Sequence, residues 1–190
     1  VAKKLGQAGA RVLLVARGVE KLEQTAEMIR KIGGEAYIYP CDLNDLKAID
    51  ALAVQVLADH GTIDILINNA GRSIRRAVVE SLDRFHDFER TMQLNYFGSI
   101  RLIMGLLPSM QAANKGQIIN ISSIGCLANA PRFAAYVASK SALDAFSRCL
   151  SAEIHQFNIN ITTIYMPLVR TPMIAPTKMY DYAPAIQPEE

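Results

Sequence analysis

The sequence predicts a doubly wound α/β fold, in which helices cover both faces of a parallel β-sheet. Short β-rich runs alternate along the chain with longer stretches in which apolar residues recur at helical spacing. The β-rich runs are apolar almost throughout, which is typical of strands buried on both faces of a parallel sheet. The 190 residues contain no internal repeat and no linker-like segment, so we expect residues 1–190 to form one domain.

Five runs are expected to form strands, because each is short, apolar and bounded by polar or helical stretches. They are Arg11–Ala16, Ala36–Tyr39, Ile63–Ile67, Gln117–Ile121 and Asn160–Tyr165. Apolar residues at helical spacing predict a helix after each of the first two strands. They are Val19, Leu22, Ala26 and Ile29 in the first helix, and Leu46, Ile49, Ala53 and Val56 in the second. Asn44 is the candidate N-cap of the second helix.

Two longer helices are expected in the second half of the chain. One runs from Leu82 to Gln111, with Pro108 ending or bending it. The other, from Phe133 to His155, carries an apolar stripe and a face of small residues. The stripe is Leu143, Phe146, Leu150 and Ile154, and the small-residue face is Ala138, Ala142, Ala145, Cys149 and Ala152. A helix buried on two sides predicts packing against the sheet and against another subunit, in a homodimer or homotetramer.

The composition narrows the class of protein. A hydrophobic content of 51% and a charged content of 20% are typical of a soluble globular domain. The net charge of +2 argues against nucleic-acid or membrane-surface partners, and no apolar run reaches the roughly 18 residues that span a bilayer. Three scattered cysteines and no signal-peptide pattern predict a cytoplasmic protein with reduced, mostly buried thiols. The three histidines lack metal-ligand spacing, so no metal site is expected.

Tyr136 and Lys140 carry the strongest chemical signal. They stand four residues apart, so they share one helix face and the ammonium can lie beside the phenol. A nearby cation lowers the pKa of a phenol toward the range useful for proton transfer. Ser123, thirteen residues upstream of Tyr136, can orient a substrate oxygen. Together these residues predict acid/base chemistry on a carbonyl or an alcohol, whereas Tyr136 and Lys140 alone are also compatible with a structural tyrosine beside a solvated lysine.

Further segments occur in a fixed order along the chain. They are Cys41-Asp42-Leu43, Asn68-Asn69-Ala70-Gly71, Asn95, Asn120-Ile121-Ser122-Ser123 and Tyr136-x-x-x-Lys140. Over essentially its whole length the chain resembles the short-chain dehydrogenase/reductase family. The resemblance implies a Rossmann-like fold and a nicotinamide cofactor. It also implies that Ser123 and Tyr136 bind the substrate oxygen, that Lys140 binds the nicotinamide ribose and lowers the Tyr136 pKa, and that Asn95 holds a helix kink and a water relay to Lys140.

Both ends of the sequence differ from the family pattern. Ala2–Ala10 matches the second half of the family's first helix, and the expected first strand with its Thr-Gly-x-x-x-Gly-x-Gly turn is not among the 190 residues. The usual final helix and strand are also not among them. We therefore expect the sequence to be an excerpt of a longer protein; the alternative is a genuine fragment that serves as a non-catalytic binding or assembly module.

The cofactor side of the fold favours NADP(H) over NAD(H). The strand Arg11–Ala16 is followed by Arg17, with no acidic residue to accept hydrogen bonds from a ribose, and an arginine there suits a 2′-phosphate. An ordinary surface arginine is the alternative. By resemblance, Asp42 and Leu43 flank the adenine, and Asn69, Ala70 and Gly71 form a turn beside the cofactor. By resemblance also, Pro167, Val169 and Thr171 lie at the nicotinamide, although Leu168 replaces the usual glycine of that stretch.

The substrate prediction depends on the segment Met173–Pro184. It is apolar, contains methionine and tyrosine, and is expected to form a lid over an apolar substrate. With Ala130–Phe133 it resembles bacterial fatty acyl-CoA reductases of wax-ester synthesis. Arg72, Arg75 and Arg76 are candidates to pair with CoA phosphates, or form a solvated basic turn. The alternative within the family is a reductase of a 3-oxoacyl thioester, ketone, steroid or small alcohol.

Overall fold

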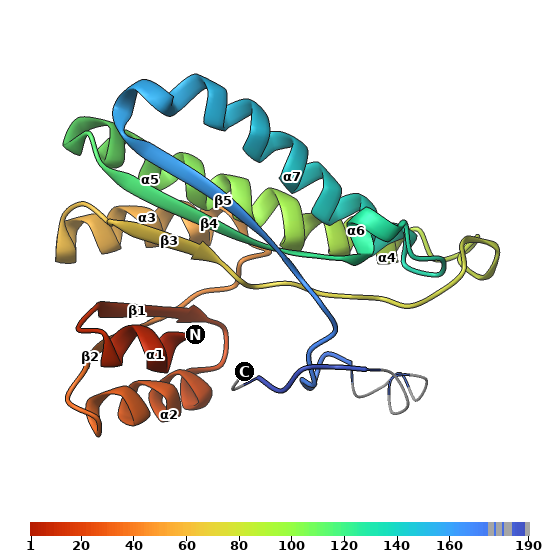
Figure 1. Cartoon of the computed structure of the whole chain (residues 1–190), viewed down its shortest axis with the longest axis horizontal. Coiled ribbons are helices and arrows are strands. Elements are labelled where there is room, and N and C mark those ends of the chain that lie inside the picture. Colours follow the sequence, from red (N-terminus) through yellow and green to blue (C-terminus); the bar gives the residue numbers. More distant parts are fainter. Residues whose placement is uncertain (175–176, 178–179, 181–183, 189–190) are drawn as a thin grey trace.

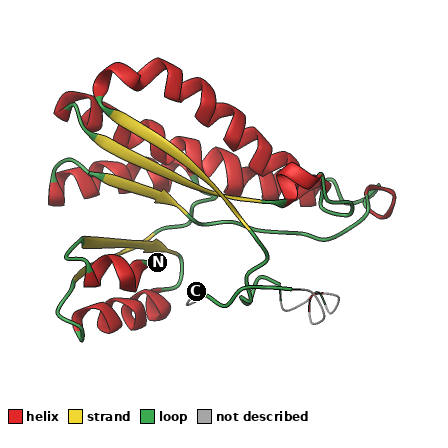
Figure 2. Cartoon of the chain, viewed as in Figure 1, coloured by secondary structure: helices red, strands yellow, loops and turns green. Residues whose placement is uncertain are grey.

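The structure is a computed structural model that describes residues 1–174, 177, 180 and 184–188. Its described strands form two parallel sheets (Figures 1 and 2). In the smaller sheet β1 (Arg11–Ala16) pairs with β2 (Glu35–Pro40). In the larger sheet β4 (Gly116–Ser123) lies between β3 (Ile65–Asn68) and β5 (Ile159–Met166). All five predicted strands are present and parallel, with ends shifted by at most two residues.

Helices accompany both sheets. The smaller sheet carries α1 (Ala2–Gln7) and α2 (Val19–Arg30), and the larger one carries α3 (Leu46–His60), α5 (Ser99–Ala113) and α7 (Ala134–Ile154) (Figure 1). The remaining helical segments are short or irregular. They are η1 (Val78–Glu80), α4 (His86–Met92), η2 (Gln93–Gly98), α6 (Gly125–Ala128) and η3 (His155–Phe157). None of the helices in the described ranges combines the length and apolar character needed to cross a bilayer.

Strand β1 contributes to two separate cores, as a doubly wound sheet requires. Val12 and Leu14 belong to the core formed with α2 and β2. Leu13 and Val15 pack against the larger core, which α3, α5 and β4 share. Successive side chains of a strand point to opposite faces, so each face of β1 is covered by its own apolar layer. The prediction of a doubly wound, Rossmann-like arrangement is confirmed.

The predicted long helix Leu82–Gln111 is divided into three parts. It begins only at His86, and α4 continues into the π-helical η2 before α5 starts at Ser99. Pro108 was expected to end or bend the helix; it lies inside α5, which continues to Ala113, so it does not end the helix. The start of α5 also needs glycine: a Cβ on Gly98 would lie 2.3 Å from the carbonyl oxygen of Leu43.

The N-cap of α3 is Asp45 and not Asn44. The Asp45 carboxylate accepts hydrogen bonds from the backbone N–H of Lys47 at 2.9 Å and of Ala48 at 3.2 Å. Asn44 lies one residue too early for this role, and its side chain donates instead to Asp42 at 2.6 Å. The misassignment therefore concerns one position, while the helix itself was predicted at the right place.

The two sheets are not hydrogen-bonded to each other. Between the facing edges of β1 and β3 lies a cavity of about 900 Å³, lined mainly by apolar residues of these strands and of α3 and α5. The additional strand expected from the family pattern is not among the described residues. The cavity lies between the two strand edges with which such a strand would pair.

Candidate active site

The predicted site residues gather at one edge of the fold, because the carboxyl ends of parallel strands meet there. Ser123 is the last residue of β4, and Arg17 directly follows β1. Three further segments follow the ends of β2, β3 and β5. They are Asp42-Leu43, Asn69-Ala70-Gly71 and Pro167–Thr171.

Tyr136 and Lys140 come to this edge from the first two turns of α7, which packs against β4 and β5. The Lys140 side chain is buried, and its Nζ donates a hydrogen bond to the carbonyl oxygen of Ile121 at 2.7 Å. The hydroxyl of Ser123 hydrogen-bonds the Tyr136 phenol and acts to lower its pKa. The Ser123 oxygen also accepts a hydrogen bond from the N–H of Gly125 at 3.1 Å. Ser123 and Tyr136 are thus hydrogen-bonded to each other, and the Lys140 ammonium lies at the carbonyl of Ile121, two residues before Ser123 on the same strand.

The pKa of Tyr136 differs in direction from the sequence-based expectation. Burial raises it above the ordinary 10, and the hydrogen bond from Ser123 lowers it by less. The Lys140 ammonium, which was expected to lower this pKa, donates to the Ile121 carbonyl. Burial lowers the pKa of Lys140 itself from 10.5 to about 8. The phenol is therefore protonated at neutral pH, as a proton donor must be.

Asn95 connects three parts of the site. It is completely buried in the π-helical η2, and its Nδ2 donates to the backbone oxygen of Arg72 at 2.8 Å while its Oδ1 accepts the Arg72 N–H at 2.7 Å. Its Nδ2 also lies 2.9 Å from the hydroxyl of Ser139, which donates to the carbonyl oxygen of Tyr136 at 2.7 Å. Asn95 therefore fixes α7 and the loop after β3 relative to each other. Ser139 was not predicted; its place directly before Lys140, on a buried helix face, was the available signal.

A second buried amide network lies beneath this one. The Asn68 side chain donates to Asn120 at 2.8 Å, and the Asn120 side chain donates to the hydroxyl of Ser147 at 2.8 Å. These bonds link β3, β4 and α7 in sequence. They hold the strand ends that carry the site at fixed positions, because buried polar groups must keep their partners.

The edge at β1 and β2 has the groups expected for an adenine ribose. Arg17 lies 3.9 Å from Asp42, and nearly two thirds of the Arg17 side chain is exposed, at 64%. The hydrogen bonds from Asn44 lower the pKa of Asp42, and the charges of Arg17 and Arg72 lower it further. Arg17, Asp42 and Arg72 thus lie near one another, with a guanidinium available to an anionic ligand. These groups fit a phosphorylated dinucleotide.

The turn after β3 reaches the catalytic residues. Asn69 is exposed, whereas Ala70 and Gly71 are half-buried. A Cβ on Gly71 would lie 3.5 Å from both the Lys140 Nζ and the Asn95 Oδ1, so the backbone passes directly beside these two groups.

The segment after β5 forms a short parallel bridge. Ile186 donates to the carbonyl oxygen of Leu168 and accepts the Arg170 N–H, each at 3.0 Å. The backbone N–H and C=O of Val169 therefore point to the opposite side of this bridge. Pro167 is exposed and Thr171 half-buried at its two ends. This geometry leaves the Val169 backbone in a position to meet a ligand.

The predicted lid Met173–Pro184 lies only partly within the described residues, since residues 175–176, 178–179 and 181–183 fall outside them. Of the described part, the Tyr180 ring stacks on Phe133 with centroids 6.4 Å apart. Tyr180 also contributes to the raised pKa of Tyr136. An aromatic side chain from this segment thus stacks on one from the start of α7.

The three candidate arginines after β3 do not form one patch. Asn95 holds the backbone of Arg72, Arg75 interacts with Tyr180, and Arg76 forms an ion pair with Asp87 on α4.

Three cysteines are free: Cys41 is buried, Cys126 half-buried beside Ser122, and Cys149 exposed, contrary to the expectation of mostly buried thiols. In the described part of the chain, no cluster of His, Cys, Asp and Glu could hold a metal ion.

Comparisons with known proteins agree with this geometry. The family model of the short chain dehydrogenases matches residues 1–180. A fatty acyl-CoA reductase of Acinetobacter baylyi is 66% identical over 190 residues, which are 100% of this chain and 64% of that protein. A fatty acyl-CoA reductase of Mycobacterium tuberculosis is 51% identical over 189 residues, 99% of this chain and 64% of that protein. The chain thus spans less than two thirds of the length of these relatives.

Solved structures show the same fold. A metagenomic short-chain oxidoreductase in complex with NADP superposes with a TM-score of 0.83 at 32% identity, over 98% of this chain and 89% of that one. An NAD⁺-bound xylitol dehydrogenase superposes with a TM-score of 0.85 at 28% identity, over 91% of this chain and 66% of that one. The chain is therefore similar both to a structure with NADP bound and to one with NAD⁺ bound.

Proposed function

Because the chain belongs to the short-chain dehydrogenase family, we propose that it forms the catalytic part of an NADPH-dependent reductase that converts a fatty acyl-CoA to a fatty aldehyde. The observation that carries this proposal is the convergence of Ser123, Tyr136 and Lys140 at the carboxyl edge of β4. The names of the two reductases similar to this chain favour the acyl thioester over other carbonyl substrates.

Each residue of the set has a role that follows from its surroundings. Ser123 and Tyr136 would donate hydrogen bonds to the thioester carbonyl oxygen, and Tyr136 would supply the proton, since its raised pKa keeps the phenol protonated at neutral pH. Lys140 uses one N–H on Ile121 and has two left for ribose hydroxyls. Bound NADPH would supply the hydride. Hydride addition to the thioester carbon and proton transfer to its oxygen give a hemithioacetal. Its carbon–sulfur bond then breaks, its hydroxyl proton passes to sulfur, and the aldehyde and the thiol of CoA are released.

The preference for NADPH is proposed from the end of β1. Arg17 is an exposed cation at the carboxyl end of this strand, and its contact with Asp42 is long at 3.9 Å. A long, exposed ion pair contributes little, so the guanidinium can turn to a 2′-phosphate at small cost. Asp42 stays hydrogen-bonded to Asn44 and remains available to the adenine.

The apolar substrate is proposed from the surroundings of Tyr136. The stacked rings of Phe133 and Tyr180 provide an apolar surface beside the phenol. A long acyl chain gains about 0.8 kcal/mol for each methylene that becomes buried on such a surface. Activity should therefore rise steeply with acyl chain length until the pocket is full.

The test follows NADPH oxidation by the full-length natural protein with a ladder of acyl-CoA chain lengths, 3-oxoacyl thioesters and simple ketones, and identifies the product. Aldehyde formed preferentially from long acyl-CoA supports the proposal. Turnover of ketones without aldehyde from any acyl-CoA would assign the protein to another reductase of the family. No turnover of any carbonyl together with no NADPH binding would favour the non-catalytic module.

A further inference from the structure

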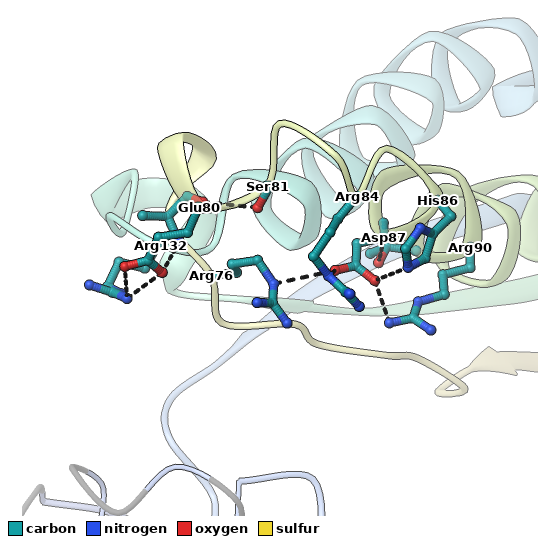
Figure 3. A network of polar contacts seen from close by, with 10 residues as sticks. Arg76, Glu80, Ser81, Arg84, His86, Asp87, Arg90 and Arg132 are labelled. Carbon is teal, nitrogen blue, oxygen red and sulfur yellow. Dashed lines mark hydrogen bonds and ion pairs between the residues drawn. The ribbon is translucent and has the colours of Figure 1, made fainter.

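A cluster of arginines surrounds one buried carboxylate, that of Asp87 (Figure 3). Asp87 on α4 is almost fully buried, with 3% of its side chain exposed. Its carboxylate contacts Arg84 Nε at 3.2 Å, Arg76 Nε at 3.4 Å and the guanidinium of Arg90. His86 Nε2 lies 3.3 Å away. Four basic side chains thus converge on a single acid.

The cluster contains more positive charge than Asp87 can balance. Although burial opposes ionisation, the hydrogen bond from Arg84 and the charges of Arg90, Arg84 and His86 hold the pKa of Asp87 below its usual value, so the carboxylate is charged. Three arginines on one carboxylate leave two unbalanced positive charges. The neighbouring Glu80 is already occupied by Arg132, which binds both of its oxygens at 2.7 and 2.8 Å. Among the described residues no other carboxylate lies within ion-pair distance of the three arginines.

The free donors of this cluster face solvent. The side chains of Arg76, Arg84 and Arg90 are 37%, 36% and 45% exposed, although each places one nitrogen on the buried carboxylate. A guanidinium has five N–H donors in a rigid fork, so each arginine keeps donors for a second anion. The buried Arg76 Nε itself lacks a well-aligned hydrogen bond. Asp87 therefore positions three guanidinium groups whose remaining donors have no carboxylate partner among the described residues.

The cluster is connected to the catalytic segment. The Arg76 N–H donates to the carbonyl oxygen of Arg132 at 2.7 Å, and Arg132 precedes Tyr136 by four residues. The loop that ends in Arg76 begins at Gly71, beside Lys140. Helix α4 packs against α7 as well. A substrate that reacts at Tyr136 and extends along this loop would bring its distal part to the arginines.

We propose that Arg76, Arg84 and Arg90 form a binding site for a phosphate group of the CoA carrier. This inference rests on the proposed function, since it concerns the distal end of the same thioester substrate. Guanidinium forks match phosphate geometry in a bidentate way, and a phosphate monoester dianion carries the charge that the cluster lacks. Among the three arginines that follow β3, only Arg76 belongs to this site, together with two arginines of the α4 region.

The test compares the wild type with the double variant Arg84→Gln/Arg90→Gln in the full-length protein. Glutamine keeps one donor for Asp87 but removes the charge. The variant should raise the KM for a long-chain acyl-CoA about tenfold with kcat within about twofold, and leave the KM for the acyl N-acetylcysteamine thioester, which has no phosphate, unchanged. Arg11→Gln/Arg148→Gln removes the same charge from exposed ion pairs elsewhere and should change neither KM.

A direct binding measurement tests the phosphate site independently of catalysis. Titration calorimetry should show adenosine 3′,5′-bisphosphate binding the wild type more tightly than inorganic phosphate, and about tenfold more weakly to the double variant. If that variant does not fold, Arg90→Gln, which leaves two arginines and His86 around Asp87, replaces it. An unchanged KM for acyl-CoA in a folded variant overturns the site while the proposed function stands. If the protein does not reduce acyl-CoA but still binds the bisphosphate in a way that depends on the arginines, the proposed function is overturned and the phosphate site stands.

Discussion

Replacing Lys140 with methionine should make the protein more stable while it destroys activity. Burial lowers the pKa of Lys140 from 10.5 to about 8, and at about 1.4 kcal/mol per pKa unit this corresponds to roughly 3 kcal/mol of lost stability when the lysine is charged. Methionine fills a similar volume without charge. It leaves the Ile121 carbonyl without its 2.7 Å partner, which costs about 1–2 kcal/mol. The net gain expected at pH 7 is therefore about 1–2 kcal/mol.

The stability cost of Lys140 is expected to depend on pH, which provides a second test. Because the folded-state pKa lies below the unfolded one, the unfolded chain binds more protons between about pH 8 and pH 10.5. The stability cost of Lys140 is present in full below pH 8 and is relieved as the pH rises through this window. Urea unfolding of the wild type and of Lys140→Met across this range should show the difference between them shrinking with pH. A variant that is less stable than the wild type at pH 7, or a difference that does not depend on pH, would refute the reasoning.

Four further predictions concern chemistry, cofactor, positioning and assembly. Tyr136→Phe should nearly abolish NADPH oxidation while NADPH affinity stays within a few-fold; activity within tenfold of the wild type would contradict the proton-donor role. Arg17→Ala should weaken NADPH binding by about 1.5–3 kcal/mol and barely change NADH binding in calorimetry, whereas equal wild-type affinities would count against it. Ser139→Ala should lower kcat about tenfold with little change in KM, because it breaks the link from Asn95 to Tyr136, and a kcat equal to the wild type would show that this link does not position the phenol. Ala145→Glu on the exposed small-residue face of α7 should convert an oligomer into a monomer in light scattering, and an unaltered oligomer would exclude that face as the interface.

The strands and most helices could be predicted from sequence because their signals are local. Each strand is a short run rich in apolar and β-branched residues, and the stripe through Leu143 and Leu150 correctly identified the buried face of α7. The break in the helix around Asn95 could not be predicted in this way. The π-helical turn accompanies hydrogen bonds from the Asn95 side chain to Arg72, 23 residues away in the chain. A pattern within one helix contains no information about that partner.

The candidate site shows the same division between local and non-local information. Spacing predicted that Tyr136 and Lys140 share a helix face, and the chain order placed Ser123 at a strand end. The direction of the Tyr136 pKa depends instead mainly on burial, which does not appear in the spacing. The proposed phosphate site shares only Arg76 with the arginines expected from sequence to pair with CoA phosphates, for a related reason. Arg72, Arg75 and Arg76 are neighbours in sequence, yet only Arg76 points to Asp87.

The buried polar groups of the site explain how a costly lysine can be held in place. Lys140 lies one residue after Ser139, whose hydroxyl joins α7 to Asn95, and Asn95 in turn holds the loop next to Gly71. Moving Lys140 toward solvent would therefore require α7 to shift and would break several buried hydrogen bonds, each worth about 1 kcal/mol or more when left unmade. These bonds offset the cost of burying the ammonium. The asparagine and serine thus stabilise a catalytic geometry that the lysine alone would destabilise.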